Sequence, residues 1–564
     1  MIIRKIGIIG RTYHHVQRYR QILSVLFKYG FGDMVDILKV EQYLEIGLQM
    51  ISRKRREKIE SLSRAERVRM ALEELGPTFV KLGQVLSTRP DILPVEFMQE
   101  LEKLQDHVPS FDCAEAKRII ESELGASLDE IFQTFDESPL ASASLGQVHR
   151  ARLANEDEVV IKVQRPDIRK TIEVDMEIML HLATLMERHL EGWDVHRPSR
   201  IVEEFSRTLE KELDYTLEAS HMERFAGQFA GDLTVYVPKV YREMTTSRVL
   251  TMEYIDGVKD NNIQLMKDRG LDPCEIARRG FDLIMKQIFV HGFFHADPHP
   301  GNIFILPDNV ICYLDFGMMG RISRQDREDF VDMVAASANK DEVKAVDVLL
   351  RLTEWEKEPD IASLQRDTAE FMDQYLYRPL KELEIGKILQ LLLKTASRHR
   401  IRIPSDLFLM MKALSTVEGV GRVLDPDFNS IKRATPFIQQ IKRDRLHPRR
   451  IAGDMADYSI EILQLIKEIP GEFREILKLA RQGKLKMEFE HQGLEPILSS
   501  HDRISNRISF AIVLAAQIIG SSLIVLADIP PKWHEIPIIG LSGFLVAGVM
   551  GFWLLVSILR RGKM

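Results

Sequence analysis

The most pronounced pattern of apolar positions lies near the C-terminus, where two long runs contain no charged residue. The first covers residues 508–527 and the second covers residues 536–559. At about 1.5 Å per helical residue, each run is long enough to cross the hydrocarbon core of a bilayer, which is about 30 Å thick. The polar segment between the runs holds Pro530 and Pro531. The pattern therefore predicts two transmembrane helices that form a hairpin.

Basic residues flank both outer ends of this predicted hairpin, whereas the turn between the runs holds one lysine and two acids. Because positive charge concentrates on the cytoplasmic side of membrane proteins, we expect the large N-terminal part in the cytoplasm and the anchor in the inner (cytoplasmic) membrane. A hairpin buried within a soluble domain is the alternative. The flanking residues are Arg503, Arg507, Arg560, Arg561 and Lys563.

Small residues recur at every fourth position of the second run, at Gly543, Ala547 and Gly551. This spacing lets two helix backbones approach each other closely. We therefore expect the two runs of one chain to pack together, and a homodimer through the same face is the alternative.

An alternating pattern predicts a loop, a strand, a turn and a second strand over residues 140–164. The β-branched residues Val159, Val160 and Ile161 favour the second strand, which carries Lys162. Small side chains let backbone N–H groups approach an anion, and a lysine adds a point charge suited to phosphates. Taken alone, a solvated lysine on an ordinary hairpin explains the same residues. The residues expected to line the phosphate site are Ala141, Ser142, Ala143, Ser144, Leu145, Gly146, Gln147 and Val148.

Two further motifs follow at a fixed separation. Residues 295–302 read H-x-D-x-x-x-x-N, and Asp315-Phe-Gly follows a short strand-like run. Phosphoryl transfer needs a group that orients the nucleophile and cations that absorb charge on the phosphates. Asp297 suits the first task, and the oxygen atoms of Asn302 and Asp315 suit Mg²⁺. Together with Lys162, this order resembles the catalytic loop and D-F-G of the protein-kinase fold.

A transition-metal site is the competing interpretation of the first motif. His295, Asp297 and His299 alternate along an extended segment and carry side chains that bind such metals. This interpretation leaves Lys162 and Asp315 without a role, so phosphate chemistry is preferred.

Residues 200–228 read as one continuous helix that carries three acids. At about 100° per residue, Asp214 and Glu218 share a face, whereas Glu212 lies about 120° away from Glu218. The two outer acids are therefore expected to serve different lysines.

The composition is that of an ordinary globular protein of several domains. The chain has 564 residues, of which 45% are hydrophobic and 29% are charged, and this excludes a disordered or fibrous protein. A net charge of −7 argues against a dedicated nucleic-acid binder. Cys113, Cys274 and Cys312 are too few and too scattered for a disulfide framework, which indicates a reducing compartment.

Four motifs occur in a specific order along the chain. They are K-x-G-Q from Lys81 to Gln84, an alanine-rich loop at 141–144, E-x-D from Glu212 to Asp214, and the catalytic-loop sequence at 294–302. In this order they resemble the UbiB/ABC1/ADCK family of atypical kinase-like proteins. The resemblance covers roughly residues 65–430, and the terminal hairpin is typical of membrane-anchored bacterial members. Ser142 departs from the family loop, in which an alanine stands at this position.

The resemblance implies an α+β, two-lobed protein-kinase-like fold with an N-terminal helical K-x-G-Q extension and a C-terminal transmembrane hairpin. It also implies that ATP or ADP binds with Mg²⁺ between the lobes. Lys162 would pair with Glu218 and hold the phosphates. Asp297 would be the catalytic aspartate, and Asn302 and Asp315 would bind Mg²⁺.

The resemblance assigns the hinge between the lobes to residues 250–257. Backbone groups near Glu253 and Ile255 would then meet adenine. Helical residues 168–197 would form a family insertion within the smaller lobe.

The resemblance also implies a regulatory role for the K-x-G-Q helix. This helix, with Lys81 and Gln84, would lie across the site and block protein substrates. Lys81 would then lie near Glu212 and Asp214.

The chain is expected to divide into six parts. In the connector at 431–506, Arg443, Arg445, Arg449 and Arg450 are expected to form a solvated face, and a surface for anionic lipid is the alternative. The parts are an N-terminal helical region at 1–64, the K-x-G-Q extension at 65–110, the smaller lobe at 111–256, the larger lobe at 257–430, a charged helical connector at 431–506 and the hairpin at 507–560.

The function that these features predict is that of a membrane-anchored, kinase-like ATPase. By the family resemblance, it would support the biosynthesis of ubiquinone, an isoprenoid quinone. Its expected partners are membrane lipids, lipid-like quinone precursors and quinone-biosynthesis enzymes, with no nucleic acid. The alternative is a catalytically silent nucleotide-binding scaffold for membrane-bound biosynthetic enzymes.

Overall fold

The computed structural model divides the chain into two compact units, Met1–Ala452 and Gly453–Met564, which are described separately. The described residues are 13–32, 62–189 apart from 91 and 105–108, 197–355 apart from 261 and 300, 359–376, 392–450 apart from 397, 400, 446 and 449, 481, 494–533 apart from 528, and 536–560.

The smaller lobe is built on a five-stranded antiparallel sheet with helices on both faces. The bounds are α7 Cys113–Leu124, α8 Leu128–Ile131, β1 Phe132–Phe135, β2 Ala141–Ser142, β3 Gly146–Leu153, β4 Glu158–Gln164, α11 Tyr215–Gln228, η2 Arg242–Met244 and β6 Val249–Glu253. The sheet order is β1-β3-β4-β6, and β2 pairs with β3. The predicted strands on either side of the turn at 154–157 are confirmed.

The alternation of side chains along β4 fixes which way its lysine points. Val159, Ile161 and Val163 pack into the cluster that includes Ile120 of α7. Val160 packs into the cluster that includes α11. Because successive side chains of a strand point to opposite faces, Lys162 lies on the same face as Val160 and faces α11.

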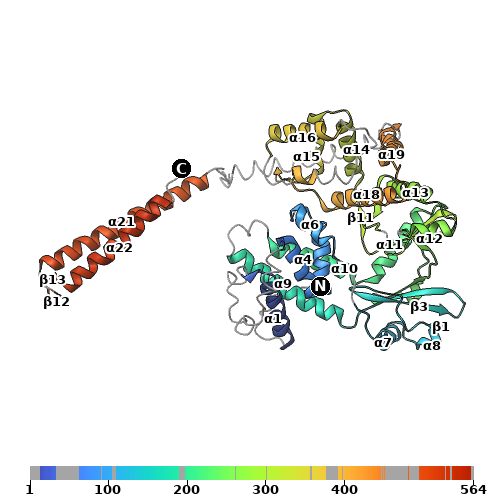
Figure 1. The fold of residues 1–564 in the computed structure, drawn as a ribbon, viewed down its shortest axis with the longest axis horizontal. Helices are drawn as coiled ribbons and strands as arrows, with labels where there is room; N and C mark the ends of the chain where they lie inside the picture. Colours follow the sequence, from blue (N-terminus) through green and yellow to red (C-terminus); the bar gives the residue numbers. More distant parts are fainter. Residues whose placement is uncertain are drawn as a thin grey trace. The chain divides into compact units, whose positions relative to one another are not determined.

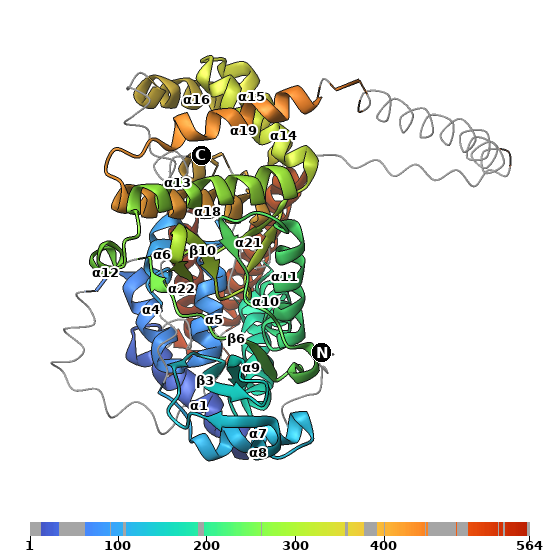
Figure 2. The ribbon, with the colours of Figure 1, turned by 90° about the vertical axis from the view of Figure 1, so that its right-hand side faces the viewer.

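The larger lobe is mostly helical, with short strands at its boundary with the smaller lobe. Figure 2 shows α7 at one end of the unit and the larger-lobe helices at the other. The helices are α12 Ile263–Asp268, α13 Pro273–Met285, η3 Lys286–His291, α14 Arg324–Ala338, α15 Glu342–Leu352, α16 Ile361–Leu376, α18 Ser405–Leu424 and α19 Ser430–Arg445. The strands are β5 Val235–Tyr236, β7 Val258–Lys259, β8 Phe293–His295, β9 Ile303–Leu306, β10 Val310–Tyr313 and β11 Met319–Arg321, with the single turn η4 at Pro307–Asn309.

Six helices outside the sheet share a second hydrophobic core. They are α1 Tyr13–Lys28, α4 Arg64–Leu75, α5 Pro77–Leu86, α6 Val95–Leu101, α9 Ile168–His189 and α10 Pro198–Glu212. A capping box formed by Ser63 and Glu66 begins α4. Gly83 allows a close approach, because a side chain there would collide with Leu104. Arg18 ties α1 to this core through an ion pair of 2.7 Å with the fully buried Asp175.

The prediction of one continuous helix over residues 200–228 is wrong. Helix α10 ends at Glu212, and α11 begins at Tyr215. Asp214 is the N-cap of α11, where its carboxylate accepts a hydrogen bond of 3.0 Å from the backbone N–H of Thr216. Because the helix is interrupted, the predicted angle between Glu212 and Glu218 does not apply.

The prediction of a solvated arginine face in the connector is wrong at two positions. Arg445 on α19 donates to Glu328 at 3.0 Å, and Arg450 also pairs with Glu328. Glu328 is itself buried on α14, so these arginines hold the connector to the larger lobe. Arg443 is exposed, as expected, and Arg449 lies outside the described residues.

The C-terminal unit contains two long apolar helices that pack together (Figure 1). Ser521 of the first helix faces Gly543 of the second, and Ala547 is buried, so small residues of the second helix lie at the contact between the two. Among the described residues, Ile508–Leu526 is long and apolar enough to span a membrane, whereas Ile538–Phe552 is shorter. The elements are α21 Leu494–Leu526, β12 Lys532–Trp533, β13 Ile536–Pro537 and α22 Ile538–Arg560.

Candidate functional site

Lys162 and Glu218 form the ion pair that the sequence predicts. The Lys162 ammonium lies 2.8 Å and 3.0 Å from the two carboxylate oxygens of Glu218. The side chains are 20% and 6% exposed. Glu218 also accepts a hydrogen bond of 3.4 Å from the backbone N–H of Phe316. One carboxylate therefore links β4 of the smaller lobe, helix α11 and the D-F-G segment.

Asp315 lies in the electric field of this lysine. Burial alone would lower the pKa of Lys162, but the carboxylates of Glu218 and Asp315 outweigh burial and raise it. The charge of Lys162 lowers the pKa of Asp315 to about 2, with help from the Gly317 N–H, which donates to this carboxylate at 2.9 Å. Both groups therefore carry their charges at neutral pH.

A β-hairpin brings Asn302 next to Asp315. Strands β9 and β10 pair so that Ile303 lies opposite Tyr313. One step further along, the Leu314 N–H donates to the carbonyl of Asn302 at 3.0 Å. The residue after Leu314 is Asp315, so the register brings the backbones of Asn302 and Asp315 close together at the end of the hairpin. The side-chain oxygens of these two residues are the type of donor that suits Mg²⁺.

His295 anchors the catalytic-loop segment to the D-F-G segment. Its ring is buried, lies 4.9 Å from the Tyr313 ring and donates from Nε2 to the carbonyl of Asp315 at 2.5 Å. Its Nδ1 accepts from the Asp297 N–H at 3.3 Å. Burial lowers the pKa of His295, which fits a neutral ring with one donor and one acceptor nitrogen.

The geometry disfavours the transition-metal interpretation of His295, Asp297 and His299. Both ring nitrogens of His295 already have partners, and Nδ1 of His299 accepts from the Gly301 N–H at 2.9 Å. No cluster of three metal-binding acids, histidines or cysteines occurs within the described ranges.

Asp297 lies at the open side of the loop, with one third of its side chain exposed. Its carboxylate is 3.9 Å from the ammonium of Lys412 on α18 and 3.9 Å from Nε2 of His299. A carboxylate in this position is reachable by a substrate hydroxyl or by water.

The small-residue loop is held in place by Arg165 at the end of β4. Arg165 donates to the carbonyl of Ala143 at 3.1 Å and to the Ser142 hydroxyl at 3.0 Å. The buried hydroxyl of Ser144 has no hydrogen-bond partner. Gly146 is required because a side chain there would lie 2.6 Å from the Tyr215 hydroxyl. Ala141 belongs to the short strand β2.

The side chains that follow the loop divide between the two faces of β3. Val148 lies opposite Lys162 in the ladder and shares its face. Gln147 points to the other face, where it is fully buried, accepts from the Phe111 N–H at 3.1 Å and bonds to His149. Leu145 is also buried in the core formed with the N-terminal helices. The side chains of Leu145 and Gln147 are therefore structural, which leaves their backbone groups for a ligand.

The predicted hinge follows strand β6. The carboxylate of Glu253 accepts from the Tyr236 hydroxyl at 2.7 Å and from the Lys239 N–H at 3.1 Å. Its side chain is therefore committed, which leaves its backbone for any ligand. Ile255 is partly buried in a segment without regular secondary structure.

Lys81 of the K-x-G-Q motif lies close to Glu212, which ends α10 and begins the E-x-D motif. Lys81 lies 3.3 Å from a carboxylate oxygen of Glu212. Gln84 donates to the Leu104 carbonyl at 3.3 Å. Asp214 instead caps α11. The charge of Lys81 also helps to lower the pKa of Asp315, so this helix contributes to the field of the site.

Sequence reasoning missed Lys412, Arg165 and Tyr215. Lys412 is the one charged residue in the apolar stretch at 407–414 of α18, which was an available signal. The Tyr215 ring lies 5.2 Å from the Lys162 ammonium, but nothing in the sequence indicates this contact.

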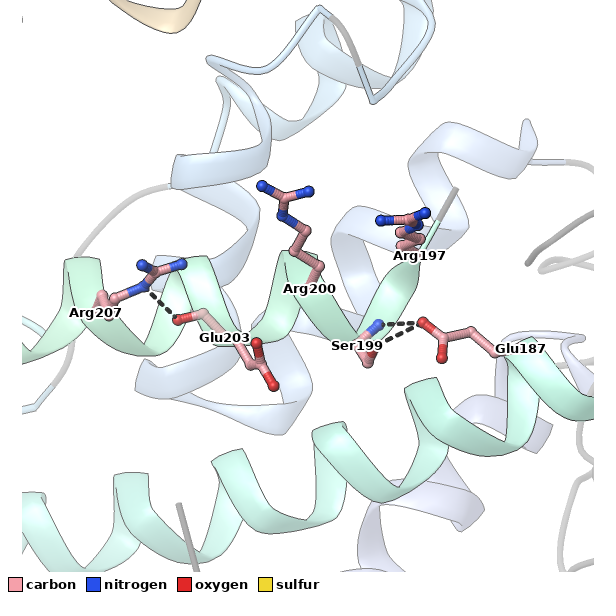
Figure 3. A pocket seen from close by; sticks show the side chains of 6 residues that line it. All are labelled: Glu187, Arg197, Ser199, Arg200, Glu203 and Arg207. Atoms are coloured by element: carbon pink, nitrogen blue, oxygen red, sulfur yellow. Dashed lines mark hydrogen bonds between the residues drawn. The ribbon is translucent and has the colours of Figure 1, made fainter. Parts of the chain in front are cut away.

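A cavity of about 450 Å³ lies at the start of α10, and none of the predicted site residues lines it (Figure 3). Glu187 already accepts hydrogen bonds from the N–H and the hydroxyl of Ser199 at 2.9 Å and 2.6 Å, so these two groups at the start of α10 have a partner. The lining residues are Glu187, Arg197, Ser199, Arg200, Glu203 and Arg207.

The α+β lobes and the lysine, glutamate and D-F-G arrangement between them are those of a kinase-like domain. Family models place an ABC1 atypical kinase-like domain at residues 103–349, a UbiB helical domain at residues 368–429 and an ABC1/UbiB kinase-like C-terminal domain at residues 492–560. The chain belongs to the UbiB/ABC1 family of atypical kinase-like proteins, as its motifs indicated.

Individual relatives cover nearly the whole chain. A probable protein kinase UbiB of Xanthomonas campestris pv. campestris is 32% identical over 97% of this chain and 100% of its own length. An uncharacterized protein from the hydrogenase 1 5′ region of Clostridium pasteurianum gives the same three values. The chloroplastic protein Activity of BC1 complex kinase 7 of Arabidopsis thaliana is 38% identical over 77% of this chain and 60% of its own length.

Proposed function

We propose that this protein is a membrane-anchored ATPase of the UbiB type that binds Mg²⁺-ATP between its lobes. The observation that carries the proposal is the Lys162–Glu218 ion pair, which is tied to the D-F-G segment through Phe316. This arrangement places a fixed positive charge beside Asp315, so that Lys162 can attract phosphate groups and the Asp315 carboxylate can hold a cation.

The residues present fit a magnesium nucleotide. Ser144 offers a buried hydroxyl without a partner, and Lys162 offers its ammonium, so both suit phosphate oxygens. Asn302 and Asp315 would hold Mg²⁺ with oxygen atoms. When bound, the ion neutralises charge on the phosphates. Asp297 would orient the attacking hydroxyl or water and accept its proton.

The adenine would contact the backbone near Glu253 and Ile255. Because the Glu253 carboxylate already has partners on Tyr236 and Lys239, it would not select the base. The Ser142 hydroxyl would affect nucleotide choice only indirectly, because it accepts from Arg165.

The K-x-G-Q helix favours a small or lipid acceptor over a protein substrate. Lys81 of α5 pairs with Glu212 of α10 and contributes to the field at Asp315. An element held this close to the site would hinder the approach of a folded protein.

The membrane and the isoprenoid quinones provide the context of this activity. The relative from Xanthomonas campestris is named UbiB, and Ile508–Leu526 is apolar enough to span a bilayer. With α22 as a second span, the hairpin would anchor the kinase-like domain in the cytoplasm. There, ATP turnover would help to present lipid-like quinone precursors to quinone-biosynthesis enzymes.

The test measures phosphate release from ATP by the full-length protein, with Mg²⁺ and with or without lipid vesicles. We expect Mg²⁺-dependent turnover, stimulation by vesicles and flotation of the protein with them. Nucleotide binding without turnover in any condition would leave the alternative, a catalytically silent scaffold. A protein that does not float with vesicles would contradict the anchor.

A further inference from the structure

A lysine from outside the kinase-type motifs lies at the catalytic loop. Lys412 stands on α18 between Met411 and Ala413, both of which are buried in the core of the larger lobe. Its own side chain is 21% exposed. An ammonium at the edge of an apolar helix is costly to desolvate, so its environment must supply compensating charge.

That compensation comes from the catalytic aspartate. The Lys412 ammonium lies 3.9 Å from a carboxylate oxygen of Asp297. This distance allows an ion pair but exceeds that of a hydrogen bond. Helix α18 packs on strand β11, which pairs with β8 just before Asp297, so the backbone holds the two residues near each other.

A second carboxylate lies within the electric field of this lysine. Glu102 follows α6 of the K-x-G-Q extension. Partial desolvation raises its pKa, although much of the side chain stays exposed; Lys412 lowers it, and the charge of Asp297 raises it. The charge of Lys412 therefore acts on this carboxylate as well as on Asp297, which is the one at ion-pair distance.

Without a cation nearby, the carboxylate of Asp297 would repel the terminal phosphate of ATP. The terminal phosphate must come close to Asp297 if that residue orients the attacking group. Lys162 forms an ion pair with Glu218 on the smaller lobe, and its charge lowers the pKa of Asp315. Lys412 is the ammonium that the structure places beside Asp297, on a flexible four-carbon stem.

We propose that Lys412 binds the terminal phosphate of ATP. This inference rests on the proposed function, and it adds a residue that distinguishes ATP from ADP. ADP lacks the phosphate that Lys412 would contact, so its affinity would not depend on this residue.

The test compares ATP and ADP affinities of the full-length protein with Mg²⁺, in Lys412→Met, Lys412→Arg and the exposed control Lys344→Met on α15. We expect Lys412→Met to weaken ATP about ten- to hundredfold and to leave ADP unchanged, because it removes one charged contact. Lys412→Arg should recover part of the ATP affinity, and Lys344→Met should match the wild type.

A second variant keeps the proposal testable if Lys412→Met does not fold. Lys412→Gln should weaken ATP binding to a similar extent with no change for ADP, because it removes the same charge and keeps a polar side chain. Equal effects on both nucleotides, or none, would overturn the role of Lys412 and leave the proposed function standing. Absence of binding of either nucleotide to the wild type would overturn both.

Discussion

Replacing Asp297 with asparagine should lower the rate of phosphate release from ATP at least a hundredfold and leave nucleotide affinity nearly unchanged. The Asp297 carboxylate is one third exposed at the catalytic loop, and the Asp297 backbone N–H donates to Nδ1 of His295, which holds the residue in place. An amide of the same size cannot accept the proton of the attacking group, and general-base catalysis typically contributes about 10²–10⁴-fold. Steady-state turnover and equilibrium binding of ATP separate the two effects.

The matched control for this variant is Asp308→Asn. Asp308 is exposed in the turn before β10 and has φ of 61°, a conformation that asparagine tolerates well. It should turn over ATP at the wild-type rate. Equal turnover in Asp297→Asn and the wild type would remove Asp297 from the mechanism.

Replacing Asp260 with asparagine should stabilise the protein at pH 8, by about 2 kcal/mol or more, and change its stability little at pH 4. Asp260 is 3% exposed after β7, and neither of its carboxylate oxygens has a hydrogen-bond partner. Burial raises its pKa from 3.8 to about 7. The difference between these values corresponds to on the order of 4 kcal/mol in the limit of complete desolvation.

The direction of this pH dependence follows from proton binding. Between pH 4 and 7 the folded protein keeps the Asp260 proton that the unfolded chain has lost, so the free energy of unfolding falls as the pH rises. Above pH 7 the free energy of unfolding is lowered by the full amount, and below pH 4 Asp260 does not lower it. Asparagine carries no charge at any of these values, so the variant should show a flatter profile.

Urea unfolding at several pH values measures this effect, with Asp256→Asn as the control. Asp256 lies four residues away, and its side chain is 77% exposed. It should unfold as the wild type does across the range. A pH profile of Asp260→Asn that parallels the wild type would show that Asp260 is ionised in the folded protein.

Local patterns predicted the residues of the candidate site because their positions depend on short-range geometry. The β-branched residues Val159, Val160 and Ile161 predicted the strand that carries Lys162, and the structure has this strand as β4. The β9–β10 hairpin brings the backbones of Asn302 and Asp315 together, although the residues are 13 positions apart in the sequence. In both cases a strand or a tight turn places the residues, and the sequence contains both signals.

Features that depend on long-range packing or on competing local signals were missed. Lys412 reaches Asp297 only because α18 packs on β11. The residues around Asp214 favour one continuous helix, but the Asp214 carboxylate caps α11, so the helix is interrupted there. Arg445 donates to the buried Glu328 of α14, which is far away in the sequence. The sequence contains the residues for each contact but no local pattern that pairs them.

The most direct test of a magnesium nucleotide held between Lys162 and Asp315 is calorimetric titration of ADP into the full-length protein, with and without Mg²⁺. The wild type should bind ADP more tightly when Mg²⁺ is present, and Asp315→Asn should lose this dependence on the ion because a carboxylate ligand is gone. The same Mg²⁺-dependent gain in affinity in wild type and Asp315→Asn would contradict the account.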